Sequence, residues 1–407
     1  MNPERLHPRH HVDIAPEALV AALRRCVGAS PEAAARFEAR LDAEGRWVLG
    51  LSVRSLLDAL LTALRWPPES EVIVSGYTIP DVGRIFAAHG LTVVAVDCDP
   101  ATLAPSRADV EAKATAKTRM LMVAQLFGAE VALEPFIALA RDRGWIFVND
   151  DAQGLTGRAR LDAQPAADVS FFSFGSIKTA TALGGGLGRF REPSLAARVR
   201  AVMSAWPRQP TARYARKVMT FLGLVVPRDP RRYELLAEAL EARGRSLDAT
   251  IMGVTRGFPA ETPGALLQAL RHRACDALAA TVEAQLAAFD AARLARRREA
   301  GERLRAQLMP HATVLGHAMP ARTHWLIAVS VPEPDGLVKH LRAQGFDAAR
   351  GTSSLAPLDP ALVQLGALHR GVVFLPGYPE IPTEDRDAMA AATAAYCQHP
   401  PAPKPSP

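Results

Sequence analysis

Two residues near the middle of the chain have the types and positions that chemistry on an aldehyde cofactor needs. Asp150 follows the apolar run in WIFVNDDAQG, and Lys178 follows a second apolar run in FFSFGSIKTATALGGG. A lysine amine can form a Schiff base with an aldehyde and, once released, can act as a general base. A carboxylate can hold a proton on a pyridine nitrogen, which makes the ring an electron sink. Together the two residues predict a pyridoxal 5'-phosphate site.

Each of these residues has a simpler explanation when it is taken alone. An aspartate after a strand is commonly a turn residue or a helix cap, and a lysine is commonly solvated. The order of the segments favours a site, because Asp150 and Gln153 follow one strand, Ser173 and Lys178 follow the next, and a glycine run comes last. The hydroxyl group of Ser173 is a candidate contact for the cofactor phosphate.

The elements that must position these residues alternate between strand and helix. Apolar runs separated by helical stretches over about residues 72–190 predict an α/β fold with a mainly parallel sheet. We expect strands at Val72–Val74, Thr92–Val96, Met120–Val123, Trp145–Val148, Val169–Phe174 and Gly186–Phe190. Apolar residues at helical spacing predict helices at Asp81–His89 and Glu134–Asp142. Ligands of such sheets bind at the carboxyl ends of the strands, where Asp150 and Lys178 are expected.

The same segments resemble a known family, the DegT/DnrJ sugar aminotransferases among the fold-type I pyridoxal-phosphate enzymes. The matching segments are YTIPDVGRIFAAHG, VDCDPATLAP, QLFG, NDDAQG, SFGSIK, GGG and FLPGYPEIPTED. The resemblance implies a PLP-dependent transferase fold of type I, with a mainly parallel seven-stranded-type sheet in a large domain and a smaller C-terminal α/β domain. It also implies a homodimeric biosynthetic aminotransferase, with glutamate or glutamine as amino donor and a keto-sugar nucleotide as acceptor. An aldehyde or ketone acceptor of another kind stays open.

The resemblance assigns roles to four residues at matching positions. Asp150 would pair with the pyridine nitrogen, and Gln153 would contact the ring hydroxyl. Ser173 would hold the phosphate, and Lys178 would carry the cofactor as a Schiff base.

A second matching segment, LGLSVRSLLDALL, resembles the turn that holds the cofactor phosphate in the family. The backbone N–H groups of Val53, Arg54 and Ser55 would face the anion at a helix N-terminus. Ile79 stands where some relatives have an aromatic ring over the cofactor. The chain departs from the family at Val53, where glycine is common, and at Leu183, which replaces an acid. The GYNYR-like segment of the family, which helps build the site across a dimer, is replaced by a basic insertion.

The basic insertion spans about residues 193–263, where the strand and helix alternation stops. Residues 198–232 hold nine basic residues and one acid, Asp229. Within it, ARYARKVMTFLGLVV is interpreted as part of a helix hairpin packed on the protein or on a dimer partner, with its arginines solvated. The alternative is an interfacial segment that receives a lipid-linked or acyl substrate near an anionic membrane.

The domain organisation follows from these features. We expect a large domain at 1–265, a long connecting helix at 266–310 (beginning near Gly264), a small domain at 311–398 and a disordered proline-rich tail at 399–407. The small domain should have strands at Trp325–Val329 and Val372–Leu375 and a helix beginning near Thr383. The N-terminal histidines His7, His10 and His11 are expected on an exposed, mobile terminus, not in a metal site.

Composition excludes several classes of protein. Of 407 residues, 49% are hydrophobic and 22% charged, as in ordinary globular proteins, and no run is long and apolar enough for a membrane span. The net charge of +6 favours anionic small molecules or anionic surfaces over nucleic acid, because only 6% of residues are aromatic and no nucleic-acid motif is present. Four cysteines without CxxC spacing predict neither a zinc site nor a disulfide framework and favour the cytoplasm.

Two other functions compete with amine transfer. The first is carbon–carbon bond formation of the α-oxoamine synthase kind, which uses a similar arrangement of aspartate, lysine and glycines. Such enzymes usually have a histidine where this chain has Gln153. The second is a scaffold or regulatory protein that keeps the fold without turnover, although retention of Asp150 and Lys178 speaks against it.

Overall fold

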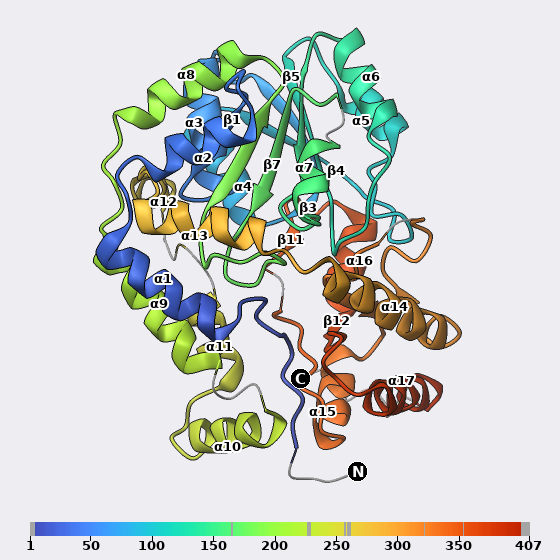
Figure 1. Cartoon of the computed structure of the whole chain (residues 1–407). Helices are drawn as coiled ribbons and strands as arrows, with labels where there is room; N and C mark the ends of the chain where they lie inside the picture. The colour runs from blue at the N-terminus through green and yellow to red at the C-terminus, as the bar shows by residue number, and fades with distance from the viewer. Residues whose placement is uncertain are drawn as a thin grey trace.

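A seven-stranded sheet forms the centre of the large domain (Figure 1). The computed structural model describes residues 5–163, 166–225, 229–255, 258, 262–320, 322–352 and 354–399. The sheet strands are β1 (Trp47–Gly50), β2 (Glu71–Ser75), β4 (Thr92–Val96), β5 (Thr118–Ala124), β6 (Ile146–Asp150), β7 (Val169–Ser173) and β8 (Gly186–Phe190). Their order in the sheet is β1-β8-β7-β6-β5-β2-β4.

Five neighbouring strands, β7, β6, β5, β2 and β4, run parallel, while β8 and β1 are antiparallel additions at one edge. The six strands predicted from apolar runs are confirmed, with small shifts at their ends. Continuous apolar runs are typical of parallel strands because helices cover both faces of such sheets. The strand β1 was not predicted, since its four residues join the sheet only through pairing with the distant β8.

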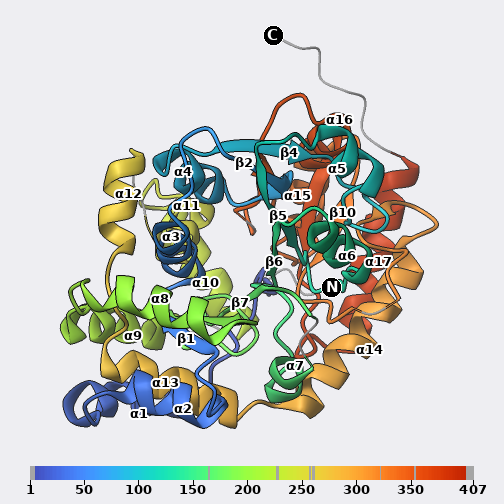
Figure 2. The same cartoon turned by 90° about the horizontal axis from the view of Figure 1, so that it is seen from above.

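Helices cover both faces of this sheet, as the view from above shows (Figure 2). One face packs on α3 (Val53–Leu64), α4 (Pro80–Ala88), α8 (Pro193–Ser204) and α12 (Pro263–Leu270). The other face packs on α5 (Arg107–Lys113), α6 (Glu134–Asp142) and part of the small domain. At the β1 edge lie α1 (Pro16–Gly28) and α2 (Ala33–Leu41), and α7 (Arg158–Asp162) follows β6. The two predicted helices, 81–89 and 134–142, are confirmed as α4 and α6.

The prediction of one long connecting helix at 266–310 is wrong, because three helices occupy this region. They are α12, α13 (Asp276–Ala287) and α14 (Ala291–Leu308). Between α12 and α13, Arg273 pairs with a distant segment: its N–H donates to the Pro207 carbonyl at 2.9 Å, and its carbonyl accepts from the Gln209 N–H at 2.9 Å. Before α14, the Asp290 carboxylate caps the new helix by accepting the Arg293 N–H at 2.8 Å. Neither break contains a proline or glycine, so the apolar spacing looked continuous.

The small domain has a three-stranded antiparallel sheet of β9 (Thr313–Val314), β10 (Ile327–Ser330) and β12 (Val372–Leu375). Its helices are α15 (Pro334–Ala343), α16 (Val363–Gly371) and α17 (Thr383–Gln398), and α14 packs along α17. A two-stranded ribbon of β3 (Tyr77–Thr78) and β11 (Ala356–Pro357) joins the small domain to the large one. The two strands and the helix predicted for this domain are confirmed. Of the predicted tail at 399–407, residues 400–407 lie outside the described residues.

The basic insertion is helical and consists of α8, α9 (Thr211–Val225), α10 (Pro230–Glu241) and α11 (Leu247–Thr255). One face of α9 is buried through Tyr214, Val218 and Phe221, in the same apolar cluster as α1 and α13. This burial supports the interpretation of a helix packed on the protein. Among the helices that the structure describes, none has the length and apolar character that crossing a bilayer requires.

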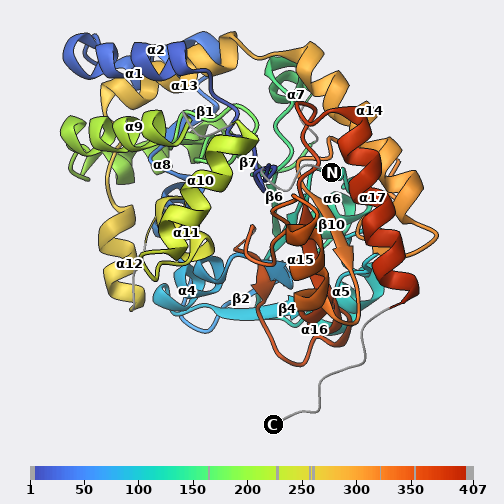
Figure 3. The same cartoon turned by 90° about the horizontal axis from the view of Figure 1, so that it is seen from below.

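The N-terminal histidines are not on an exposed terminus, so that prediction is wrong. Residues 5–13, called the N-terminal strap below, run between the insertion and the small domain (Figures 1 and 3). The N–H of Leu6 donates to the Pro230 carbonyl at 3.2 Å, and that of His7 donates to the Gly345 carbonyl at 2.8 Å. These contacts to two distant segments hold the strap, which therefore does not belong to the large domain alone.

Candidate active site

A cavity of about 1160 Å³ lies at the carboxyl ends of β5, β6 and β7, and residues of the insertion and the small domain complete its wall. Its position agrees with the rule that ligands of parallel sheets bind beyond the carboxyl ends of the strands. The predicted site residues that line it are Val53, Arg54, Ile79, Asp150, Gln153, Ser173 and Lys178. Of the predicted site residues, only Ser55 does not line this cavity.

Two adjacent acids lie at the carboxyl end of β6, where Asp150 is the last residue of the strand and Asp151 follows it. The carboxylate of Asp150 lines the cavity and accepts the Ala152 N–H at 3.2 Å. Asp151 is fully buried and does not line the cavity, and its Oδ2 accepts a hydrogen bond from Arg160 Nε at 2.8 Å. Successive side chains of an extended segment point to opposite sides, which explains this division. Only Asp150 is placed to contact a ligand.

Burial dominates the ionisation of Asp150. Desolvation raises the pKa of its carboxyl group, while the Ala152 N–H and the positive charge of Lys178 act in the opposite direction. A ligand that brings a positive charge to this carboxylate, such as a protonated pyridine ring, would favour its ionised form.

The amine of Lys178 lies in the same cavity, in the loop after β7. Its backbone N–H donates to the Gly175 carbonyl at 3.0 Å, and its Nζ lies 4.1 Å from the centre of the Trp325 ring. Burial lowers the pKa of Lys178 to about 8; the Asp150 carboxylate opposes this shift and the Arg54 guanidinium adds to it. At pH 7 about a tenth of the amine is therefore neutral, and so nucleophilic, which is far more than for an ordinary lysine. Trp325 was predicted as part of a strand but not as a site residue.

Two serines in the loop after β7 add hydroxyl groups to the cavity wall. Ser173 Oγ accepts the Gly175 N–H at 3.2 Å, which leaves its own proton available to a ligand. The side chain of Ser176 is buried, and its Oγ has no hydrogen-bond partner among the described residues. A buried hydroxyl without a partner is costly, and an anionic ligand would satisfy it. Sequence reasoning missed Ser176, although it lies in the same SFGSIK segment.

The amide group of Gln153 is held by a turn after β5. Its Oε1 accepts the Phe127 N–H at 2.8 Å, which leaves the amide NH₂ group as the donor for a ligand. Phe127 belongs to the QLFG segment, so this segment orients Gln153.

The N-terminus of α3 borders the cavity through Val53 and Arg54 but not through Ser55. Ser52 Oγ caps the helix by accepting the Ser55 N–H at 3.1 Å, and Ser55 Oγ donates to the Leu270 carbonyl at 2.9 Å. Ser55 therefore faces α12, and its N–H is already used, so the prediction of a phosphate contact at Ser55 is wrong. The N–H groups of Val53 and Arg54 precede the first intrahelical bonds and stay available to an anion.

This helix end lies unusually close to the sheet. A Cβ atom on Gly186, at the start of β8, would lie 2.4 Å from the Val53 nitrogen. Only glycine therefore lets β8 pass directly beneath the turn. The guanidinium of Arg54 is ion-paired with Asp81 and lies 4.7 Å from the centre of the Phe258 ring, so its charge is partly neutralised. Ile79 lines the cavity directly before α4 and supplies apolar surface.

The N-terminal strap supports the Lys178 loop from outside the cavity. The Ile177 carbonyl accepts two hydrogen bonds, from Trp325 Nε1 at 2.9 Å and from His10 Nε2 at 3.1 Å. Burial lowers the pKa of His10 to about 4, with Asp13 opposing this shift, so the ring is neutral and its Nε2–H donates. The backbone on one side of Lys178 is thus fixed by two distant segments.

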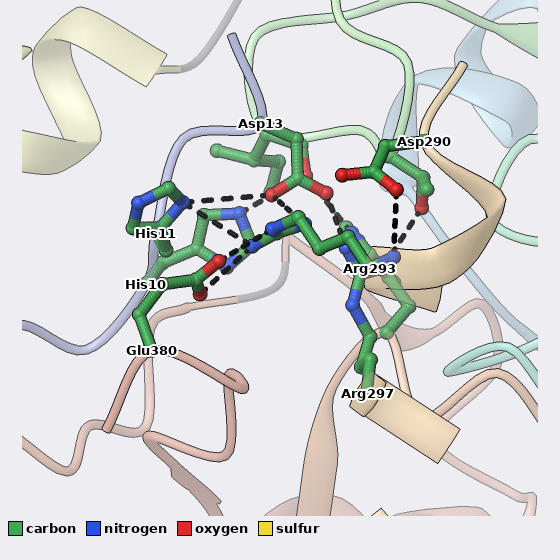
Figure 4. Close-up of polar contacts among 10 residues, drawn as sticks. His10, His11, Asp13, Asp290, Arg293, Arg297 and Glu380 are labelled. Carbon is green, nitrogen blue, oxygen red and sulfur yellow. Dashed lines mark hydrogen bonds and ion pairs between the residues drawn. The ribbon is translucent and has the colours of Figure 1, made fainter. Parts of the chain in front are cut away.

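An ion-pair network fixes the other side of Lys178 (Figure 4). Arg297 is ion-paired with Asp13 of the strap, and its Nη1 donates to Thr179 Oγ1 at 3.2 Å. Arg293 Nη1 lies 2.7 Å from Asp13 Oδ1, and its Nε donates to Glu380 Oε1 at 2.5 Å. Although burial works against ionisation of Asp13, its hydrogen bond to His11 and the charges of Arg297 and Arg293 keep its pKa at about 2. The network therefore stays charged at neutral pH.

A third anchor ties the strap to the insertion and the small domain. Arg9 Nε donates to Asp347 Oδ2 at 2.8 Å, and Arg9 is also ion-paired with Asp248 of α11. The Tyr233 hydroxyl of α10 donates to Asp347 at 2.6 Å. The strap therefore links the insertion to the small domain, and both of these border the cavity.

The groups around this cavity fit pyridoxal phosphate. A nucleophilic amine and a carboxylate, from Lys178 and Asp150, could hold the aldehyde and the ring nitrogen. The phosphate suits the N-terminus of α3 and the buried hydroxyl of Ser176, which bonds to none of the described residues. Gln153 adds a donor for the ring hydroxyl.

Relatives of known name match parts of the chain. The chain is 31% identical over 144 residues to the "Pleiotropic regulatory protein" of Geobacillus stearothermophilus, over 34% of the chain and 39% of that protein. It is 32% identical over 143 residues to the "UDP-N-acetyl-3-dehydro-alpha-D-glucosamine 3-aminotranferase" of Acidithiobacillus ferrooxidans, over 34% of the chain and 38% of that protein. The matches thus span about two fifths of the length of these relatives.

The fold is shared along nearly the whole chain with a solved structure, the aminotransferase TlmJ from Streptoalloteichus hindustanus. The TM-score is 0.69 at 20% identity, covering 96% of this chain and 98% of TlmJ. Residues 17–391 match the model of one family, which includes the cavity, the Lys178 loop and the small domain. The chain therefore belongs to the DegT/DnrJ/EryC1/StrS aminotransferase family.

Proposed function

We propose that this chain is a pyridoxal-phosphate-dependent aminotransferase that moves an amino group from glutamate or glutamine to a keto or aldehyde acceptor. The observation that carries the proposal is the amine of Lys178, with a pKa of about 8, in the same cavity as the Asp150 carboxylate. Bound pyridoxal phosphate would supply an electron sink that makes the α-proton of the substrate removable.

The residues of the chain divide the work among them. Lys178 Nζ attaches the cofactor and, once released by the donor, accepts and returns the proton as general base. The Asp150 carboxylate accepts the hydrogen bond of the ring N–H and keeps that nitrogen protonated. Ser173, Ser176 and the N-terminus of α3 bind the phosphate, with Arg54 at the same helix end.

A keto-sugar nucleotide is the acceptor class that we favour. The family membership supports it, and so does the name of the Acidithiobacillus relative, which is a 3-aminotransferase of a UDP-linked dehydro sugar. The size of the cavity, about 1160 Å³, supports it too, because pockets of roughly 300–1,000 Å³ already bury a drug-sized ligand.

The test uses purified full-length protein loaded with pyridoxal phosphate. Adding glutamate should bleach the visible band of the cofactor and release 2-oxoglutarate, without any acyl-CoA. A requirement for acyl-CoA would indicate an α-oxoamine synthase instead. The absence of a yellow band in protein incubated with the cofactor near neutral pH would indicate a scaffold or regulatory protein without turnover, and the Geobacillus relative is named a regulatory protein.

The rate of cofactor attachment should depend on pH, with a midpoint near the pKa of Lys178. The neutral amine is the nucleophile, and its fraction rises as pH rises through the pKa of about 8. An ordinary lysine, with a pKa of about 10.4, would place the midpoint far higher. Stopped-flow absorbance of apoprotein mixed with pyridoxal phosphate between about pH 6 and pH 10 measures this. A rate that still climbs steeply above about pH 9.5 would contradict the assignment.

The N-terminal strap should affect the reactivity of Lys178. In His10→Leu the Ile177 carbonyl loses one of its two donors, whereas in His10→Gln an amide can replace it. Loss of one buried hydrogen bond costs about 1 kcal/mol, so we expect cofactor attachment in His10→Leu to slow by roughly fivefold, with a lower melting temperature. Equal attachment rates in the Leu and Gln variants would contradict this support.

We also infer a cytoplasmic homodimer. Resemblance to the family supports the dimer, and four cysteines without paired spacing support a reducing compartment. Light scattering after size-exclusion chromatography tests the dimer, since a monomeric mass with full activity would contradict it.

A further inference from the structure

The inserted helix α9 presents a basic face to the cavity that holds Lys178. Arg213, Arg216, Lys217 and Thr220 all line this cavity. Residues three and four positions apart lie on one side of a helix, so the four side chains form a single face. α9 itself contains no acidic residue. The insertion therefore contributes three cations to the wall of the catalytic cavity.

The opposite side of α9 fixes this orientation. Tyr214, Val218 and Phe221 are buried in the apolar cluster that also contains residues of α1 and α13. The Tyr214 hydroxyl donates to the Ala182 carbonyl at 3.0 Å, in the loop that follows Lys178. Because α9 is anchored to the Lys178 loop itself, its basic face is held at a fixed position relative to the reactive amine.

The three cations are not paired with an acid in the part of the chain that the structure describes. Among the described residues, none of the ion pairs includes Arg213, Arg216 or Lys217. Within the described ranges, the cavity wall has three acids: Asp81 pairs with Arg54, Asp248 pairs with Arg9, and Asp150 is the carboxylate proposed for the ring nitrogen of the cofactor. Within the part of the chain that the structure describes, no acid therefore neutralises the three cations of α9.

The surroundings of Lys217 make this imbalance costly. Burial, together with the charges of Arg54 and Arg213, lowers the pKa of Lys217 to about 8. A half-buried ammonium group among other cations is stabilised in its charged form when an anion binds beside it. The wall is thus suited to a ligand with more than one negative charge.

We propose that Arg213, Arg216 and Lys217 form a subsite for the phosphate or diphosphate group of the carbonyl acceptor. This inference rests on the proposed aminotransferase function and names the residues that select its acceptor. The cofactor phosphate is the other possible source of the same chemistry, but the N-terminus of α3, Ser173 and Ser176 already serve it. The insertion thus supplies, within the same chain, a binding wall for the second substrate.

The experiment compares Lys217→Gln and Arg216→Gln with Arg232→Gln, which removes an exposed arginine of α10 outside the cavity. Binding of inorganic pyrophosphate and of UDP to the cofactor-loaded full-length protein is measured by titration calorimetry at low and high salt. The Kd of pyridoxal phosphate and the KM of glutamate in the donor half-reaction are measured for the same variants. Melting curves check that each variant folds.

Loss of one charge-assisted contact should weaken pyrophosphate and UDP binding roughly tenfold in Lys217→Gln. The effect of Arg216→Gln should be smaller, because its side chain is exposed, and Arg232→Gln should bind like the natural protein. Binding should weaken as salt rises, while the cofactor Kd and the KM of glutamate stay within about twofold.

Three results would overturn the inference. The first is unchanged pyrophosphate and UDP binding in the α9 variants. The second is a raised Kd of pyridoxal phosphate with unchanged pyrophosphate and UDP binding, which would show that the basic face of α9 binds the cofactor phosphate. The third is a raised KM of glutamate alone, which would assign it to the donor carboxylates. Failure of the proposed aminotransferase function would be seen separately. In that case glutamate would not change the visible band of the cofactor in the natural protein, whether or not pyrophosphate binds.

Discussion

Lys178→Ala is expected to abolish covalent attachment of pyridoxal phosphate and to lower transamination by at least about a thousandfold. The variant removes both the nucleophile that holds the cofactor and the base that moves the proton, and losses of this kind are of that order. The measurement is borohydride reduction of the loaded protein, followed by mass analysis of the peptide that carries the cofactor. In the natural protein the label should lie on Lys178.

The cavity offers a matched control for this variant. Lys217 lines the same cavity, and its pKa is lowered to the same value, about 8. Lys217→Gln should nevertheless keep the label, because the charge of the Asp150 carboxylate acts on Lys178 and not on Lys217. A label that survives Lys178→Ala and disappears in Lys217→Gln would show that Lys217 is the attachment site.

Asp150→Asn should keep cofactor binding but lower kcat by at least about a hundredfold. An amide carries no negative charge, so the ring nitrogen would lose the partner that keeps it protonated. The same variant removes the group that raises the pKa of Lys178, so the pKa should fall below about 8 and the midpoint of cofactor attachment should move to lower pH. Absorbance titration and steady-state kinetics measure both effects.

The neighbouring acid provides the control. Asp151 is fully buried and bonded to Arg160, and a Cβ on Gly154 would lie 2.0 Å from its Oδ1. Asp151→Asn breaks a buried charge pair, so we expect a loss of roughly 3 kcal/mol in stability, with kcat of the folded fraction nearly unchanged. If Asp151→Asn abolished turnover in folded protein and Asp150→Asn did not, the roles of the two acids would be reversed.

The sequence itself determined the sheet and the place of its two reactive groups. Apolar runs identified six strands of the seven, and polar residues at their carboxyl ends identified Asp150, Gln153, Ser173 and Lys178 as neighbours. These predictions succeeded because they depend on local pattern. A buried strand can be recognised from a run of a few apolar residues, and the carboxyl ends of parallel strands necessarily meet at one edge of a sheet.

Only the tertiary structure decided what surrounds those groups. It showed that Ser55 bonds to Leu270 instead of facing the cavity, and that Trp325 lies against Lys178. It also placed the strap through His10 and the basic face through Lys217. Each of these contacts joins segments far apart in the chain, and no local period or spacing encodes which distant surface a side chain will meet. Packing of the helices and the small domain around the sheet settles that choice.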